Sequence, residues 1–124
     1  NIPFNPSKST TYKGLMLSGL PNLIFFAGYT NASWTLKSDL TSEYASRLIK
    51  VMDKKNYSSF VALKNGEKME TIPLLNLNSG YINRSSNIFP KQGSKLPWRL
   101  YQNYFFDYAM LRINKIDDKF LSFI

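Results

Sequence analysis

The 124-residue chain contains neither cysteine nor histidine. Without cysteine it has no disulfide framework, no thiolate metal site and no cysteine nucleophile. Without histidine it lacks the commonest general base and the commonest ligand of transition metals, which excludes every Ser-His-Asp interpretation. We therefore expect no catalytic residue and no metal site in this chain. The absence of cysteine is compatible with the cytoplasm, which is the expected location.

Long hydrophobic runs are also absent. The longest one, residues 23–27, is far shorter than the about 20 residues that a membrane-spanning helix needs. No Gly-x-Gly-x-x-Gly occurs, so the chain carries no dinucleotide pyrophosphate cradle. What the chain does have is 44% hydrophobic and 15% aromatic residues, which suffice for the buried core of one globular domain.

The net charge is +8, and the basic excess is spread along the chain. Residues 1–62 contain seven basic and three acidic residues, and residues 63–124 contain nine and five. The densest basic stretch, which holds no acidic residue, contains Arg84, Lys91, Lys95 and Arg99. A solvated loop, an intramolecular phosphate contact, a nucleic-acid patch and a membrane surface all fit this stretch, and composition alone does not decide between them.

Short hydrophobic segments predict several strands. We expect strands at residues 12–17, 60–63 and 120–123, and a turn at Asn65 and Gly66. Residues 23–27 are continuously hydrophobic, which favours a strand covered on both faces, as in a parallel sheet. A short helix or turn is expected around residues 74–81.

A long amphipathic helix is predicted over residues 36–54. Its recurring hydrophobic face consists of Leu36, Leu40, Tyr44, Leu48 and Val51 or Met52. Ser33 and Thr35 are both candidate N-caps, and Asp39 is expected in the first turn, where a carboxylate suits the helix dipole. Asn56 is the expected end of the helix.

A second helix is predicted over about residues 97–113, opened by Pro97. Its aromatic stripe, expected to lie mostly in the core, consists of Trp98, Tyr101, Tyr104, Phe105, Tyr108 and Leu111. Asp107 falls opposite this stripe and is expected to be solvated. Asp117 and Asp118 are adjacent carboxylates that we interpret as an ordinary exposed turn rather than as a metal or acid–base pair.

The segment between the predicted strand at 23–27 and the long helix has the features of a ligand-binding turn. A strand that ends at Gly28 lets the backbone approach a ligand without an intervening Cβ. Small and hydrogen-bonding residues follow, and the helix start then presents unpaired N–H donors and a positive dipole end. In open α/β sheets, ligands bind beyond the carboxyl ends of strands. An ordinary βα loop with an ordinary cap has the same pattern.

Two long sequence blocks favour the ligand-binding turn over the ordinary βα loop. Residues 18–53, SGLPNLIFFAGYTNASWTLKSDLTSEYASRLIKVMD, resemble the C-terminal part of bacterial flavin-containing monooxygenases of the Baeyer–Villiger class. Residues 80–112, GYINRSSNIFPKQGSKLPWRLYQNYFFDYAMLR, resemble a later block of the same family, and residues 115–123, KIDDKFLSF, resemble its usual ending. The resemblance covers about residues 12–123, in order and without a large gap.

The resemblance implies a fold and an activity. Such enzymes bind FAD in one doubly wound domain and NADPH in another, and insert one oxygen atom of O₂ into a ketone or add it to a sulfur. By this resemblance the fold class is α/β, or α+β for an isolated fragment. Residues 1–56 would form the end of the FAD-binding domain, and residues 57–124 a C-terminal extension that carries the helix at about 97–113.

The resemblance also implies a cofactor site. The residues expected to line the flavin are Gly28, Tyr29, Thr30, Asn31, Ser33, Trp34 and Thr35. Backbone N–H groups near residues 34–36 would approach the electron-rich pyrimidine edge of the flavin ring.

Because both pyrophosphate cradles are missing, this chain is expected to be an inactive fragment that binds neither FAD nor NADPH alone. Its expected partners are the missing N-terminal FAD and NADPH domains, and the parent enzyme would act on a small organic substrate. Exposed apolar faces could pair two copies of the chain, and no specific nucleic acid is expected. The alternative is a small basic module that binds nucleic acid or an anionic surface.

Overall fold

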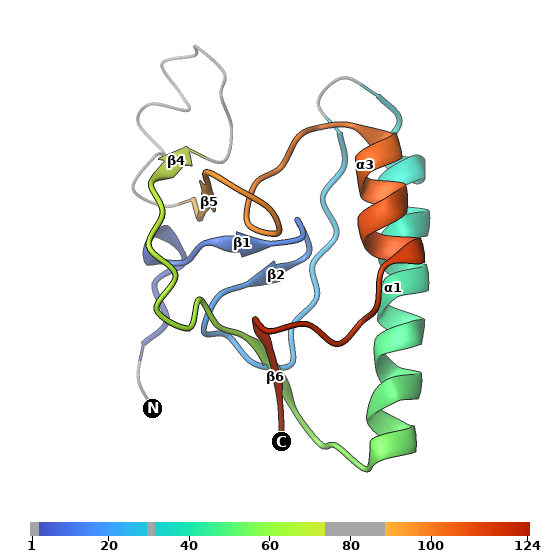
Figure 1. Cartoon of the computed structure of the whole chain (residues 1–124). Coiled ribbons are helices and arrows are strands. Elements are labelled where there is room, and N and C mark those ends of the chain that lie inside the picture. Colours follow the sequence, from blue (N-terminus) through green and yellow to red (C-terminus); the bar gives the residue numbers. More distant parts are fainter. Residues whose placement is uncertain (1–2, 30–31, 74–88) are drawn as a thin grey trace.

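The computed structural model describes residues 3–29, 32–73 and 89–124, and within them one long helix stands beside three small antiparallel sheets (Figure 1). In chain order the elements are η1 (Pro6–Lys8), β1 (Thr11–Tyr12), β2 (Met16–Leu17), α1 (Trp34–Lys55), β3 (Phe60–Ala62), β4 (Thr71–Pro73), β5 (Lys91–Gly93), α3 (Tyr104–Tyr108), η2 (Ala109–Ile113) and β6 (Leu121–Phe123). The short element η1 is a 3₁₀ turn, and η2 is a π-helical continuation of α3. The predicted element around residues 74–81 lies outside the described residues.

Each sheet consists of two paired strands. Strands β1 and β2 form a hairpin, β3 pairs with the C-terminal β6, and β4 pairs with β5. The single strand predicted at 12–17 is thus a hairpin, because the backbone reverses at Lys13 and Gly14, which have φ of 53° and 70°. The predictions at 60–63 and 120–123 are confirmed by β3 and β6, and that at Asn65 and Gly66 by a turn.

The strand predicted at residues 23–27 is wrong. This segment is extended (light blue in Figure 1) but has no strand partner among the described residues. Its amide at Phe25 donates to the Leu15 carbonyl at 2.8 Å, while Leu23 and Phe26 are 38% and 52% exposed. A strand buried on both faces needs neighbouring strands and covering helices, and the described residues supply neither here. The doubly wound α/β fold therefore stays a prediction.

Helix α1 confirms the predicted long helix. The Ser33 hydroxyl caps it by accepting from the Thr35 amide at 3.2 Å, and Asn56, at φ 59°, ends it in the left-handed conformation. Because the helix begins at Trp34, Asp39 lies beyond the first turn, contrary to expectation. Among the described residues, no helix is long and apolar enough to cross a membrane.

The core lies between α1 and the β1–β2 hairpin. From α1 it receives Leu40, Tyr44 and Leu48, three of the predicted face, whereas Leu36 is exposed. The hairpin and the C-terminal part contribute Tyr12, Leu15, Met16, Trp98, Leu111, Ile116 and Phe120. Trp98 is in edge contact with both Tyr12 and Phe120, at centroid distances of 5.3 and 5.4 Å. Burial of such side chains contributes about 1.5–3 kcal/mol each.

The second helix begins at Tyr104 rather than at residue 97. Residues 97–103 form a loop whose polar backbone groups bond to β5: the Trp98 carbonyl accepts from the Gly93 amide, and the Leu100 amide donates to the Gln92 side chain, both at 2.9 Å. Asn103 then caps α3, accepting from the amides of Phe105 and Phe106. The helix therefore starts where an Asx cap is available, not at the proline.

Helix α3 and η2 pack against the N-terminal half of α1 (Figure 1). Arg47 of α1 holds the far end of η2. Its guanidinium donates to the carbonyls of Leu111 and Arg112 at 2.9 Å each, and to that of Asn114 at 2.7 Å. These carbonyls close a helix and lack helical partners, so one arginine joins the two helices.

Candidate functional site

Gly28 and Trp34 lie against each other at the start of α1. A Cβ atom built on Gly28 would overlap the indole ring of Trp34. Trp34 is the first residue of α1, and its side chain is 61% exposed. The glycine therefore lets an exposed aromatic ring rest directly on the main chain, which no other residue at position 28 permits without displacing the ring.

The first turn of α1 faces outward. Ser33, Trp34, Thr35 and Leu36 are all exposed. An α-helix leaves the N–H groups of its first turn without helical acceptors, and the helix dipole makes this end positive. The Ser33 hydroxyl accepts from the Thr35 amide. This end of the helix thus has the donor set and the charge that suit an anionic or electron-rich ligand edge.

Of the seven expected flavin-lining residues, five are described. Gly28, Ser33, Trp34 and Thr35 gather at the helix start, whereas the ring of Tyr29 turns into the protein and is buried. Thr30 and Asn31 lie outside the described residues. The contact of these residues with flavin stays a prediction.

Tyr29 is bound to Asp107 of α3. Its hydroxyl donates to Asp107 Oδ2 at 2.5 Å, and both side chains are buried. Burial, and after it this hydrogen bond, raises the pKa of Tyr29 above its ordinary value. Tyr29 is therefore a neutral hydrogen-bond donor throughout the physiological range.

Lys37 reaches the same carboxylate oxygen. Its Nζ lies 3.2 Å from Asp107 Oδ2 and 5.9 Å from the centre of the Tyr29 ring. Burial lowers the pKa of Lys37, and the negative charge of Asp107 opposes this shift. The expectation that Asp107 is solvated is wrong, since Asp107 is only 5% exposed. Asp107 faces Lys37 of α1, not water.

Lys37 is a buried residue that the predicted site did not include, although the sequence carries a signal for it. Lys37 precedes Thr41, Tyr44 and Leu48 at helical spacing, and all four are buried on one face of α1. A lysine on a buried face requires a counter-charge. The position of that counter-charge, Asp107, carried no comparable signal.

A small cavity lies beside these residues. It has a volume of about 20 Å³ and is lined by Gly14, Ala27, Gly28, Tyr29, Lys37, Leu100, Gln102 and Asp107. A Cβ on Gly14 would lie 3.2 Å from Lys37 Nζ and 2.6 Å from the Leu100 side chain. The glycine thus makes room for the ammonium group, and the remaining space is enough for about one water molecule.

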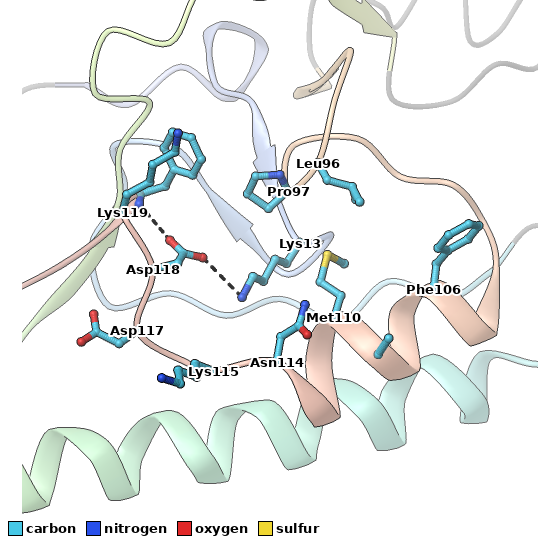
Figure 2. Close-up of a pocket in the computed structure, with 12 residues that line it drawn as sticks. Lys13, Leu96, Pro97, Phe106, Met110, Asn114, Lys115, Asp117, Asp118 and Lys119 are labelled. Atoms are coloured by element: carbon cyan, nitrogen blue, oxygen red, sulfur yellow. Dashed lines mark hydrogen bonds and ion pairs between the residues drawn. The ribbon is translucent and has the colours of Figure 1, made fainter.

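A larger cavity, of about 460 Å³, opens between the 96–97 turn, η2 and the 114–120 loop (Figure 2). In Figure 2 the side chains of Lys13 and Asp118 point toward each other, with Nζ and Oδ2 3.5 Å apart. Asp118 Oδ1 accepts from the amides of Phe120 and Leu121, and Oδ2 accepts from the Tyr12 hydroxyl. Asp118 is thus fully engaged in holding the loop.

Asp117 does not share the contacts of Asp118. It forms an exposed ion pair with Lys55 at 3.6 Å instead. The adjacent carboxylates therefore serve two separate contacts. Among the described residues no group of three or more acidic side chains is placed to hold a metal ion.

The basic stretch does not form one patch within the described residues. Lys95 pairs with Glu67, and the Arg99 guanidinium lies over the Tyr101 ring at 5.0 Å. Lys91 instead lines a polar cavity of about 480 Å³ together with Lys8 and Lys64. Arg84 lies outside the described residues.

Several aromatic side chains in α3 and in the loop before it are exposed. Part of the predicted stripe is buried, as expected for Trp98 and Leu111, but Phe105 is 81% exposed. Phe106 and Tyr101 are also exposed, and their rings are 5.4 Å apart. Exposed apolar clusters of this kind commonly mark interaction surfaces.

Comparison with known proteins identifies relatives over most of the chain. It is 46% identical over 117 residues to the FAD-containing monooxygenase EthA of Mycolicibacterium smegmatis, covering 94% of this chain and 24% of that protein. It is 49% identical over 112 residues to EthA of Mycobacterium tuberculosis, covering 90% and 23%. It is also 42% identical over 122 residues to an Acinetobacter baylyi protein named "Probable FAD-binding monooxygenase AlmA", covering 98% and 24%.

The chain therefore spans about a quarter of the length of these curated relatives. No protein-family profile and no solved structure matches it. The resemblance to flavin-containing monooxygenases that the two sequence blocks indicated is confirmed by these homologues.

Proposed function

We propose that this chain is the C-terminal quarter of an FAD- and NADPH-dependent monooxygenase of the Baeyer–Villiger class. The parent enzyme would insert one oxygen atom of O₂ into a ketone or add it to a sulfur. One observation carries the proposal: the chain is 42–49% identical to proteins whose names describe FAD-containing or FAD-binding monooxygenases. Within this chain, the start of α1, which follows Gly28, is exposed.

The described residues suit a role in holding FAD. The first-turn amides of residues 34 and 36, which the Ser33 hydroxyl does not cap, would donate to the pyrimidine edge of the flavin. The positive end of the helix dipole would favour the charge of the reduced ring. The indole of Trp34, which already covers Gly28, would border the flavin. FAD, when bound, supplies the electron transfer and oxygen chemistry, and this chain supplies orientation and electrostatics.

The chain alone is proposed to be inactive and to bind neither FAD nor NADPH. Its proposed partners are the N-terminal FAD and NADPH domains of the same protein, and its location the cytoplasm. Trp34, at the start of α1, and Phe105 and Phe106, in the first turn of α3, are exposed aromatic residues, which suits burial against those domains. A second copy of the chain is the other occupant that this surface would accept.

The alternative, a basic module for nucleic acid or an anionic surface, has weaker support. Lys8, Lys64 and Lys91 line one polar cavity, but Lys95 and Arg99 have partners within the chain. Polyanion binding by the chain is the result that would favour this alternative.

The test is to express the chain together with its upstream coding sequence. We expect a yellow protein that releases FAD on denaturation and consumes NADPH with O₂ in the presence of a ketone or sulfide. A colourless protein that does not bind added FAD would refute the proposal. Binding of the chain to polyanions, with a steep loss of affinity as salt increases, would instead favour the basic module.

A further inference from the structure

One carboxylate oxygen contacts two residues that lie on either side of the exposed start of α1. Asp107 Oδ2 accepts from the Tyr29 hydroxyl at 2.5 Å and pairs with Lys37 Nζ at 3.2 Å. Tyr29 comes just after Gly28, and Lys37 lies one turn into α1. The exposed helix start, with Ser33, lies between these two anchored positions.

The three anchoring side chains are buried. Tyr29, Lys37 and Asp107 are each 4–5% exposed. A hydrogen bond or ion pair in this setting is not weakened by competition from water, and the loss of one partner leaves another buried polar group unsatisfied. Replacement of the carboxylate by an amide would remove the negative charge that Lys37 requires and leave Tyr29 a weaker, neutral acceptor.

Asp107 comes from a different part of the chain from the segment that it anchors. It lies in α3, within the 57–124 extension, whereas Gly28 and the start of α1 belong to the part assigned to the FAD-binding domain. The extension thus reaches back to the candidate cofactor segment through one buried side chain.

We propose that Asp107 is a positioning residue for FAD: by holding Tyr29 and Lys37 it sets the position of Gly28 and of the start of α1, which would face the flavin. This inference rests on the proposed function. It adds that the C-terminal extension contributes directly to cofactor binding, although none of its own residues needs to touch FAD. Loss of the Asp107 charge should therefore weaken FAD binding and alter the environment of the bound flavin.

The test uses the full-length protein with Asp107→Asn. The dissociation constant for FAD is measured by fluorescence titration of the cofactor-free protein, and the visible absorption band of the bound flavin is recorded. Below the melting temperature of each variant, we expect Asp107→Asn to raise the Kd about tenfold or more and to shift the flavin band. The matched control is Asp117→Asn, which changes an exposed surface carboxylate and should leave both readouts unchanged.

Two further variants keep the test decisive if Asp107→Asn folds poorly. Tyr29→Phe removes only one hydroxyl and should raise the Kd severalfold, whereas Tyr57→Phe, at the far end of α1, should not. The effects of Lys37→Met and Asp107→Asn on the Kd for FAD should also be non-additive, because both substitutions break the same contact.

The outcomes separate the two proposals. A wild-type protein that binds no FAD refutes the proposed function. A wild-type protein that binds FAD, with Tyr29→Phe and Asp107→Asn matching it in Kd and flavin spectrum, refutes the positioning role alone. Fully additive effects of Lys37→Met and Asp107→Asn would also overturn it.

Discussion

Lys37 of α1 and Asp107 of α3 form an ion pair at 3.2 Å with side chains only 5% and 7% exposed. The pair joins two helices that are distant in sequence and adjacent in space. Its net contribution to stability is small, because burial of both charges offsets their attraction. What it does provide is a definite relative position for the two helices.

Removal of one partner is expected to be costly. Lys37→Met leaves the Asp107 carboxylate buried without its counter-charge, so the free energy of unfolding should fall by about 3–5 kcal/mol. Lys55→Met, the same substitution on the same helix, breaks an exposed pair with Asp117 and should cost less than about 1 kcal/mol. Urea denaturation of both variants measures the difference, and equal losses would contradict the role of the buried pair.

Gly28→Ala is expected to displace the Trp34 ring. The added methyl group overlaps the indole, so we expect a loss of about 1–3 kcal/mol of stability and a change in tryptophan fluorescence. In a Trp34→Ala background the overlap is absent, and Gly28→Ala should cost about 1 kcal/mol or less. A loss that is the same in both backgrounds would show that the ring is not the cause.

Arg47→Met should loosen the junction between α1 and the end of η2. Three carbonyl groups lose a charged donor, which predicts a loss of about 2–3 kcal/mol in the free energy of unfolding. Arg112→Met is the control, because Arg112 forms a half-exposed pair with Glu43 at 3.0 Å and such pairs contribute about 0–1 kcal/mol. Chemical denaturation that finds the control equally harmful would argue against the cap.

Stability should fall at alkaline pH. Burial raises the pKa of Tyr12, Tyr29 and Tyr44 above the ordinary value. In the unfolded chain these hydroxyls ionise near pH 10, so above that pH the unfolded state binds fewer protons than the folded state. The stability linked to each tyrosine is therefore complete below about pH 10 and decreases by up to about 1.4 kcal/mol per pH unit above it.

Two buried lysines have the opposite effect on the pH dependence of stability below about pH 10.5. Burial lowers the pKa of Lys13 and Lys37, so the unfolded state binds more protons up to about pH 10.5 and stability rises with pH there. The tyrosine effect is isolated by the slope above pH 10.5. Tyr29→Phe should make that slope shallower by up to about 1.4 kcal/mol per pH unit, measured by denaturation between pH 10.5 and 12. An unchanged slope would contradict the burial of this hydroxyl.

Local features were predicted well. Helix α1 follows from the spacing of Leu40, Tyr44 and Leu48, and its ends follow from Ser33 and Asn56. Each of these signals acts within a few residues, through side-chain spacing, a capping hydroxyl or a left-handed end residue. The resemblance to flavin-containing monooxygenases was likewise readable from two contiguous blocks.

Predictions that depended on distant partners failed. Residues 23–27 have the composition of a buried strand, but a strand forms only when another strand offers its hydrogen bonds. Pro97 suits a helix start, yet the backbone groups of residues 98–100 bond to β5 instead. In both cases the hydrogen-bond partners available in the folded chain, rather than the local sequence, decided the backbone conformation.

By itself, the sequence determined the long helix, its caps, the strands β3 and β6 and the family resemblance, because each depends on neighbouring residues or on residue identity. Only the tertiary structure decided that Asp107 meets Tyr29 and Lys37, that Gly28 supports the Trp34 ring, and that Arg47 closes η2. Such contacts join positions that are not neighbours along the chain. They depend on the relative placement of packed elements, which no local period encodes.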